Sequence, residues 1–388
     1  AVHVLPIVTI PQGKIGYVFA RDGKPLPPSQ TLASNEKADD FQDAATFLKA
    51  GGSRGPQRKI LREGSYAIHL AQFVVIAEER VYALALDKAE EELFRRMATL
   101  IKERDGFNPV VIKGHDDMLG IVTVHDGPSL AQGQIIAPTV GEDPTNVATY
   151  HNSFQDPERF LAGGGMRGRQ YQALVEGTYY INRLFATVEL VPKTVIEVGN
   201  VGVVVSYTGA VGTDLSGEQY KHGELVQKGL RGVWSEGLMP GKYAFNTYAG
   251  KVNMVPTTNF ILKWNKSESG EHKYDENLAE VSLITKDAFE PSLPLSVVVH
   301  IDYRKAPLVI QRFGDIKKLV EQTLDPMVSA YFKNIGQTRT LIELLQDRSE
   351  IQSLSSEEMK AKFGVYNLEL QEVLIGTPRP NAAGDDQI

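Results

Sequence analysis

Apolar positions in the first two thirds of the chain come in short runs that end at glycines, a pattern that predicts β-strands separated by tight turns. One arrangement occurs three times: Arg-Gly, Leu seven residues after the arginine, Gly ten residues after it, and a closing Gly-x-Tyr-x-apolar-His/Asn. The copies are Arg54, Gly55, Leu61, Gly64, Tyr66, Ile68 and His69; Arg167, Gly168, Leu174, Gly177, Tyr179, Ile181 and Asn182; and Arg231, Gly232, Leu238, Gly241, Tyr243, Phe245 and Asn246. Because so many positions recur at one spacing, the chain is built from repeats.

A second shared piece precedes each copy, a glycine followed by Val two residues later and another Gly seven residues later. These residues are Gly16, Val18 and Gly23, then Gly120, Val122 and Gly127, then Gly202, Val204 and Gly209. The stretch from this piece to the arginine differs in length among the copies, which is typical of surface loops. The two constant ends therefore predict strands, and the variable middles predict loops between them.

Helical patterns appear at one place within the repeats and again near the end of the chain. Asp87 and Glu90 form a capping-box pattern, and the apolar stripe that follows predicts a helix ending before Gly106. Beyond the repeats, 278–286 and 294–303 predict an antiparallel hairpin whose second strand has Tyr303 on its core face. The remaining expected elements are a helix from Pro307 to Gly314, a longer helix from Ile316 with a kink at Pro326, helical stretches at 337–345 and 356–363, and a strand at 365–375 opened by Gly364.

The fold class expected from these elements is α+β. Tandem β-rich units come first, and a strand-strand-helix-helix-strand core domain follows them. The expected divisions are 1–115 for the first β-rich unit with its inserted helix, 116–190 for the second, 191–256 for the third, 257–376 for the core domain and 377–388 for a flexible tail.

Composition narrows the functional classes. The chain of 388 residues carries a net charge of −7, which argues against an electrostatic surface for nucleic acid. It contains no Cys, so disulfides, thiolate nucleophiles and cysteine-ligated zinc are excluded. No apolar run reaches the roughly 18 to 20 residues of a spanning helix, and no signal peptide is visible. The first residue is Ala1 rather than Met, which leaves room for an N-terminal segment that was processed or removed.

Several residues could carry chemistry, yet each has a simpler structural interpretation. His115 with Asp116 and Asp117, and His125 with Asp126, suggest metal ligands or an acid-base pair, but these sequences are ordinary turns. The glycines between Gly163 and Gly168 resemble a phosphate loop, but no Gly-Lys-Ser/Thr follows. No Gly-x-Ser-x-Gly elbow is present. The sequence therefore predicts no catalytic, cofactor-binding or metal-binding residue and no cofactor.

The repeated arginines and tyrosines also admit two interpretations. Arg54, Arg167 and Arg231 are expected to pair with a nearby carboxylate or to cover apolar surface with their stems. The alternative is that they meet a neighbouring subunit or an anionic lipid headgroup. The tyrosines are expected to occupy equivalent buried, strand-pairing places in three superposable β units rather than to form a ligand cage; they are Tyr66, Tyr179 and Tyr243.

A series of short motifs in the last third resembles the SPFH or band 7 family, which includes stomatins, prohibitins and flotillins. The motifs are Lys286-Asp287 after an apolar strand, a strand running into Tyr303, Ala306-Pro307 opening a helix, Pro326 within a helix, Arg348 with Glu350-Ile351, and a closing Gly364-Val365. The resemblance covers about 257–376, and the third β unit looks like the first subdomain of the family. Family members usually begin with a membrane anchor and continue into a long coiled coil, and this chain shows neither. The extra β units make the larger bacterial flotillin-like proteins the nearer comparison.

The resemblance implies a non-enzymatic, membrane-associated scaffold that assembles with itself into large rings or cages and organises membrane microdomains. The implied partners are further copies of the chain, lipids contacted through a segment outside these residues, and a membrane-protein client, without nucleic acid. The implied location is the bacterial inner membrane, with the cytoplasmic side favoured. Two alternatives stay open: a prohibitin-like enclosure that regulates a membrane protease, and a soluble β-rich ligand-binding protein or enzyme whose ligand lies in loops such as 138–160.

Overall fold

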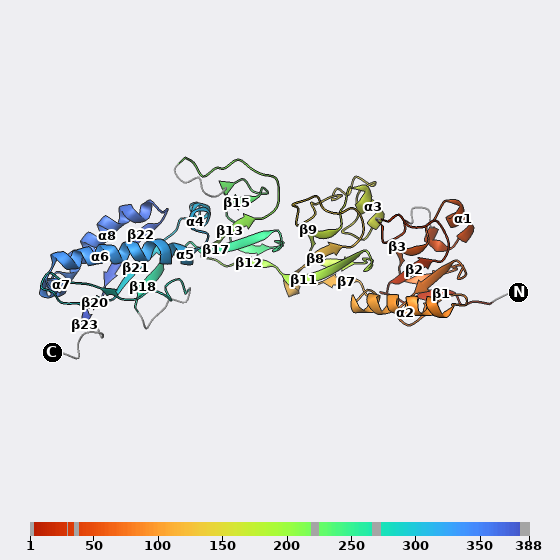
Figure 1. Cartoon of the computed structure of the whole chain (residues 1–388), viewed down its shortest axis with the longest axis horizontal. Coiled ribbons are helices and arrows are strands. Elements are labelled where there is room, and N and C mark those ends of the chain that lie inside the picture. Colours follow the sequence, from red (N-terminus) through yellow and green to blue (C-terminus); the bar gives the residue numbers. More distant parts are fainter. Residues whose placement is uncertain (1–3, 29, 35–38, 219–224, 266–272, 381–388) are drawn as a thin grey trace. The chain divides into compact units, whose positions relative to one another are not determined.

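The computed structural model describes residues 4–28, 30–34, 39–218, 225–265 and 273–380 (Figure 1). Two compact bodies divide the chain. The N-terminal body contains Ala1–Lys193 together with Ala244–Ala249, and the C-terminal body contains Thr194–Tyr243 together with Gly250–Ile388. The first two β units therefore lie in the N-terminal body, and the third β unit lies with the core domain, except for one short turn.

The same β topology occurs three times, as the repeated pattern predicts. In each unit a central strand lies between two antiparallel neighbours, and a separate short pair of strands contains the Gly-x-Tyr motif. The first unit contains β1 (Val8–Ile10), β2 (Gly16–Ala20), η1 (Asp39–Phe41), α1 (Ala44–Lys49), β3 (Gly55–Leu61), β4 (Gly64–Tyr66), β5 (Phe73–Ile76), β6 (Val81–Tyr82) and α2 (Lys88–Glu103). Its four-stranded sheet has the order β3-β2-β5-β6, and β1 pairs with β4.

The second and third units repeat this plan with small differences. The second contains β7 (Val110–Ile112), η2 (Gly114–Asp116), β8 (Met118–Val124), α3 (Pro157–Ala162), β9 (Gly168–Leu174), β10 (Gly177–Tyr179) and β11 (Ala186–Pro192). The third contains β12 (Thr194–Ile196), β13 (Asn200–Ser206), β14 (Leu225–Val226), β15 (Gly232–Trp234), β16 (Gly241–Tyr243) and β17 (Gly250–Pro256). The central strands are β8 and β13, and the short pairs are β7 with β10 and β12 with β16. Strand β7 lies inside the range 1–115 expected for the first unit, but its pairing joins it to the second.

The repeated tyrosines occupy equivalent places, as expected, but those places are half-buried rather than buried. Tyr66 pairs across the short sheet with Val8, and Tyr179 pairs with Val110. Each tyrosine hydroxyl donates a hydrogen bond to the carbonyl four residues earlier, at 2.9, 2.9 and 2.7 Å in the three units. The ring therefore closes the turn before its own strand, and its edge stays in contact with solvent.

The first glycine of each unit is required by close packing. Gly16, Gly120 and Gly202 lie on the central strands, and a Cβ on Gly16 would lie 2.5 Å from Cδ1 of Ile10. On Gly202 it would lie 2.4 Å from Cδ1 of Ile196, the equivalent isoleucine of the third unit. The short strand of each unit thus packs its last isoleucine directly against the backbone of the central strand.

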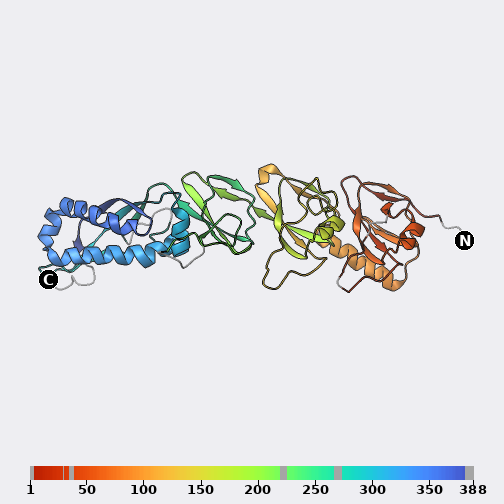
Figure 2. The same ribbon diagram turned by 90° about the horizontal axis from the view of Figure 1, so that it is seen from above.

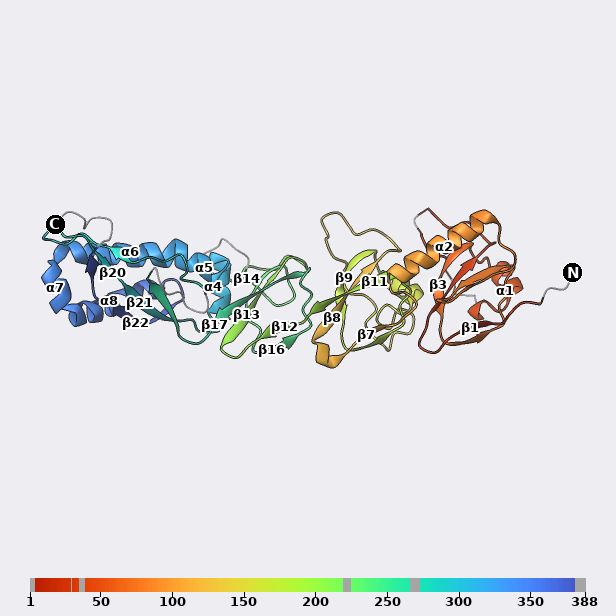
Figure 3. The ribbon, with the colours of Figure 1, turned by 90° about the horizontal axis from the view of Figure 1, so that it is seen from below.

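The inserted helix α2 belongs to the first unit, and its capping box forms as the sequence predicts. The Asp87 side chain accepts from the Glu90 amide, and the Glu90 side chain accepts from the Asp87 amide. Phe94 and Ile101 are buried against the sheet face that contains Tyr17. Figure 3 shows α2 lying along the first unit, and this packing accounts for the amphipathic stripe.

The core domain in the C-terminal body combines a three-stranded sheet, order β18-β21-β22, with a layer of helices (Figure 2). Its elements are β18 (Phe260–Trp264), β19 (Val281–Ser282), β20 (Pro291–Leu293), β21 (Leu295–His300), α4 (Ala306–Phe313), α5 (Ile316–Leu319), the π-helical η3 (Val320–Leu324), α6 (Asp325–Thr338), α7 (Leu341–Gln346), α8 (Arg348–Gly364), β22 (Glu369–Ile375) and β23 (Arg379–Pro380). Val297, Val299 and Ile301 are fully buried in its core.

Three details of the core domain differ from the sequence prediction. The predicted hairpin of 278–286 with 294–303 is wrong, because β21 pairs with β18 and β22 while β19 pairs with the short β20. Tyr303 lies beyond the end of β21 and is exposed rather than on the core face. Gly364 ends helix α8 instead of opening a strand, and β22 begins five residues later at Glu369.

Pro326 changes the winding of its helix in a way the sequence did not specify. The residues before it form a π-helical segment, and the Asp325 amide donates to the Val320 carbonyl five residues back. A proline cannot donate an amide hydrogen bond, so the helix accommodates it by widening the preceding turn. The widened turn places Asp325 where its carboxylate accepts from the indole of the fully buried Trp264, at 2.8 Å.

Replacement of Gly16 by Ala tests the packing of the central strands. We expect a loss of about 1 to 3 kcal/mol in the free energy of unfolding of the N-terminal body, because the new methyl group collides with Ile10. Adding Ile10→Val removes the colliding Cδ1 atom, so the double variant should lose less than the sum of the two single losses. Urea denaturation measures all three variants. Gly364→Ala is the control, because a Cβ there meets nothing within 4 Å, and strictly additive losses would contradict the packing argument.

Candidate functional site: the junctions between β units

Within the N-terminal body, the turn after the Gly-x-Tyr strand of the second unit contacts the first unit, and the turn after the Gly-x-Tyr strand of the third unit contacts the second. We call this segment the clasp turn; it comprises 180–185 in the second unit and 244–249 in the third. The third unit's clasp turn is the only part of that unit that belongs to the N-terminal body. The equivalent residues of the first unit are 67–72.

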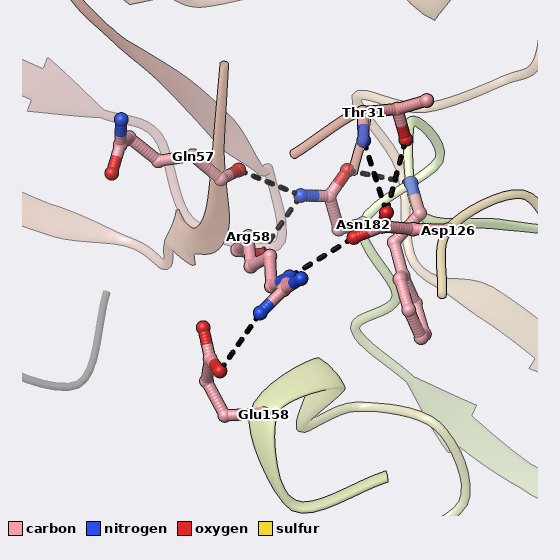
Figure 4. Close-up of polar contacts among 7 residues, drawn as sticks. Thr31, Gln57, Arg58, Asp126, Glu158 and Asn182 are labelled. Carbon is pink, nitrogen blue, oxygen red and sulfur yellow. Dashed lines mark hydrogen bonds and ion pairs between the residues drawn. The ribbon is translucent and has the colours of Figure 1, made fainter. Parts of the chain in front are cut away.

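An asparagine at the same repeat position makes the same contact in both clasp turns. The Asn182 Nδ2 donates to the carbonyl oxygens of Gln57 and Arg58 on β3, at 3.1 and 2.9 Å (Figure 4). Asn246 Nδ2 donates to the carbonyl oxygens of Gln170 and Tyr171 on β9, at 2.9 and 3.2 Å. Both asparagines are buried. In both turns a buried amide donates to two strand carbonyls and so ties the turn to that strand within the N-terminal body.

The side-chain oxygen of each asparagine holds its own turn in shape. Asn182 Oδ1 accepts from the amide of Leu184 at 2.8 Å, and Asn246 Oδ1 accepts from the amide of Tyr248 at 3.1 Å. Asparagine is suited to this double task, because its side chain carries two donors and one acceptor. The last position of the repeated sequence pattern is therefore the residue that joins the units.

In both junctions a glutamine side chain makes the same hydrogen bonds at the start of the strand that contacts the clasp turn. Gln57 and Gln170 are equivalent, each lying three residues after the repeated arginine. Their side-chain amides donate to two nearby main-chain carbonyls, at 2.9 and 2.9 Å for Gln57 and at 2.8 and 2.8 Å for Gln170. These bonds hold the start of the strand in a fixed shape and leave its own carbonyl free for the asparagine.

A buried ion-pair network reinforces the first junction (Figure 4). Arg58 on β3 donates from Nε to Asp126 and from Nη1 to Glu158, both at 3.0 Å. The side chains of Arg58 and Asp126 are 4% and 0% exposed, respectively. Asp126 also accepts from the amide and the hydroxyl of Thr31, at 3.1 and 3.3 Å. Because Arg58 and Asp126 are removed from water, loss of either partner would leave a buried charge without its counterion.

A second set of contacts surrounds the same clasp turn. The Tyr17 hydroxyl donates to the Gly106 carbonyl at 2.7 Å and accepts from the Arg183 amide at 3.2 Å. Burial raises the pKa of Tyr17 well above its ordinary value, so its hydroxyl stays protonated and donating. Arg62 lies over the ring of Tyr180, 3.4 Å from its centroid. In the second junction Arg169 lies over Tyr248 at the same distance of 3.4 Å, although it comes from a different repeat position.

The repeated arginines share one backbone contact. The amides of Arg54, Arg167 and Arg231 donate to the residue after the second repeated glycine, at 2.9, 2.9 and 3.0 Å. All three side chains are exposed. Among the described residues, no carboxylate forms an ion pair with any of them, and the coverage of apolar surface by their stems stays a prediction. Arg167 instead donates from its guanidinium to Ser129.

The residues considered for chemistry have ordinary structural contacts. His115 is exposed in the turn η2, and its nearest acid is the adjacent Asp116, 3.1 Å away. His125 contacts the Thr187 hydroxyl at 3.0 Å, and burial lowers its pKa. In the described ranges, no group of three or more His, Asp or Glu residues could hold a metal ion. Asp126, considered as a ligand or an acid-base partner, is instead the buried partner of Arg58.

The glycine run has a structural role. Gly163 ends helix α3, where its amide donates to the Arg159 carbonyl at 2.9 Å. A Cβ on Gly165 would lie 2.2 Å from the ring of Phe160. Strand β9 then begins at Gly168. The run therefore turns the chain tightly past a buried phenylalanine, and the phosphate-loop interpretation has no structural support.

An open cleft of about 670 Å³ lies beside the first junction. Its walls come from β3 of the first unit and from the loop and helix α3 of the second. The charged residues of its lining are already paired with others: Lys59 with Asp40, Arg62 with Glu63, Arg159 with Asp156 and Glu158 with Arg58. Part of the cleft lining comes from the loop 138–160, where a ligand was considered. Because the charged side chains of the lining are paired with opposite charges, the cleft has no excess of positive or negative groups that would attract a charged ligand.

Comparison with known proteins identifies the family. The family profile described as SPFH domain / Band 7 family matches residues 167–388, more than half of the chain. The chain belongs to the SPFH/band 7 family. The match begins at the repeated arginine of the second unit, so it includes the receiving strand of the second junction as well as the third unit and the core domain. No individual curated protein matches the chain.

Family membership fixes the broad class of function. SPFH/band 7 proteins are in general membrane-associated scaffolds without enzymatic activity. In the parts of this chain that the structure describes, no helix combines the length and the apolar character needed to cross a membrane.

Replacing Asn182 by Ala tests the clasp contact. The substitution leaves two buried strand carbonyls without a donor, so we expect about 1 to 3 kcal/mol of lost stability in the N-terminal body. Urea denaturation followed by circular dichroism measures this loss. His69→Ala is the matched control, because His69 occupies the same repeat position and is exposed. Equal effects of the two substitutions would contradict a joining role for the asparagine.

Replacing Arg58 by Met tests the ion-pair network. The change leaves Asp126 buried without its cation, and we expect a loss of about 3 to 5 kcal/mol. Adding Asp126→Asn removes the isolated charge and should recover part of the loss, which a double-mutant cycle of unfolding free energies detects. The exposed pair of Arg96 with Glu92 is the control, and its removal should cost little. A double variant as unstable as the sum of its parts would show that Arg58 and Asp126 are not coupled.

Proposed function

We propose that this protein is a flotillin-like membrane-associated scaffold that assembles with itself into large rings or cages and organises membrane microdomains. The observation that carries the proposal is the tandem array of β units preceding an SPFH core domain. An array of this kind provides several equivalent surfaces for contacts with other proteins and few side chains arranged for catalysis, which suits a scaffold better than an enzyme.

The form of the junctions supports assembly by head-to-tail contacts. Each junction is heterologous, since a clasp turn from one unit meets a strand of a different kind on its neighbour. Contacts of this type close into rings when the rotation between neighbours permits, and otherwise they propagate. A chain that already uses this chemistry between its own units is a suitable building block for such an assembly.

In the proposed assembly, membrane association depends on many weak lipid contacts rather than on one strong lipid-binding site. The chain carries a net charge of −7, so a general electrostatic attraction to anionic lipids is not available. Weak contacts repeated around a ring add as avidity. We propose that these contacts are made through a segment outside the residues described, at the cytoplasmic side of a bacterial inner membrane, and that a membrane protein is the client.

The intact protein, extracted from membranes with mild detergent, provides the test. We expect a particle of megadalton scale in sedimentation velocity, rings or cages in negative-stain images, and flotation of the purified particle with liposomes. A monodisperse monomer recovered without detergent would overturn the proposal. Co-purification of a membrane protease inside the particle would favour instead the prohibitin-like role, an enclosure that regulates such a protease.

A further inference from the structure

His151 occupies an unusual place in the second unit. It is fully buried, and its ring contacts those of Phe154 and Phe160, with centroids 4.8 and 5.3 Å away. Its Nδ1 accepts from the Phe154 amide at 2.8 Å, and its Nε2 lies 2.8 Å from the Val140 carbonyl. An amide can only donate and a carbonyl can only accept, so these partners require the neutral ring with its proton on Nε2.

The residues after His151 adopt a conformation that non-glycine residues rarely hold. Asn152, Ser153 and Phe154 have φ angles of 46°, 56° and 66° in succession. Left-handed backbone costs of the order of 1 kcal/mol or more at each such residue, so three in a row persist only where other contacts hold them. Two of those contacts come from His151, whose ring accepts from Phe154 and whose carbonyl accepts from the Asp156 amide at 3.1 Å.

This strained turn leads directly into the first junction. Gln155 accepts, through Oε1, a hydrogen bond of 2.9 Å from the amide of Tyr180, the first residue of the clasp turn. Asp156 caps helix α3, and Glu158 on the same helix pairs with the buried Arg58 of the first unit. The contact of Glu158 with Arg58 across the junction, and the support that Gln155 gives to the clasp turn within the second unit, therefore depend on the turn that His151 holds.

We propose that neutral His151 stabilises the junction between the first and second β units and that its protonation weakens this junction. Protonation would place a hydrogen on Nδ1, facing the Phe154 amide, and two donors cannot share that contact. The left-handed turn would then relax, and Gln155 and Glu158 would withdraw from Tyr180 and Arg58. The predicted result is a reversible loosening of the junction under mild acid, with the β units themselves still folded.

The surroundings of His151 fit this assignment. Burial lowers its pKa, while the carboxylates of Glu142 and Asp156, the acidic groups that face it, act in the opposite direction. The folded state thus favours neutral His151. Its stabilising effect is present above the ordinary histidine pKa of about 6.5 and is lost as the pH falls from there towards the lowered value. The unfolded chain binds the proton more readily, so the junction should weaken with falling pH, not with rising pH.

Spin labels on the two units provide the measurement. The chain contains no Cys, so Ser65→Cys with Thr178→Cys labels only these two sites, which are exposed and equivalent in the first and second units. We expect the distribution of label-to-label distances to broaden several-fold between pH 7.5 and 5.5 and to recover when the pH is restored. A distribution that stays unchanged to pH 5.5 would overturn the proposal.

His151→Gln separates this device from other effects of acid. Glutamine can accept from Phe154 and donate to Val140 but does not titrate in this range, so the distribution should stay narrow at both pH values. Broadening of the same size in this variant would overturn the proposal, because another group would then be responsible. The exposed His115→Gln is the matched control and should broaden as the parent does. If His151→Gln does not fold, hydrogen exchange at Arg183 in the unaltered chain decides, because the Arg183 amide donates to the Tyr17 hydroxyl of the first unit. Its protection should fall at pH 5.5 while the central strand β8 stays protected, and retained protection at Arg183 would overturn the proposal.

Discussion

The N-terminal body depends on one requirement, that the main-chain carbonyls at the start of each receiving strand find donors when a clasp turn covers them. Buried carbonyls without donors would cost more than the contact gains. Asn182 and Asn246 meet this requirement with the same atoms at the same repeat position. The surrounding features follow from it. The clasp turns must be rigid, the receiving glutamines must point to their own main chain, and the first junction adds a buried ion pair that excludes other arrangements.

Much of the fold could be predicted from the sequence, because it depends on residues that are close together in the chain. The spacing of glycines and tyrosines specifies three units, and the capping box specifies α2, since both depend on residues that are near neighbours in the chain. The role of Asn182 depends on Gln57 and Arg58, more than a hundred residues away, and no spacing rule connects them. The signal was nevertheless present: the pattern's last position is His in the first unit, where the described residues show no clasp contact, and Asn in the other two.

The errors in the core domain have a common physical origin. Strand pairing depends on which apolar faces meet in space. The alternation of residues along β21 is compatible with a simple hairpin, so the sequence suggested one. The strand is also apolar enough to lie between β18 and β22, and this is where the fold places it. The helix containing Pro326 shows the same limit in another form. A proline predicts that a helical hydrogen bond is lost, but whether the helix kinks or widens depends on the contacts around it, here the bond between Trp264 and Asp325.

The third unit departs from the other two at one receiving position. Trp234 stands where Gln57 and Gln170 stand, and its indole donates to the carbonyl four residues back at 3.0 Å, as the glutamine amides do. The local turn is thus preserved, while the surface it presents is changed from an amide to an aromatic ring. The second unit alone among the three carries both a clasp asparagine and a receiving glutamine, because the first unit has His69 at the asparagine position and the third has Trp234 at the glutamine position. The receiving position is therefore an amide in the two units of the N-terminal body and an aromatic ring in the unit that lies with the core domain.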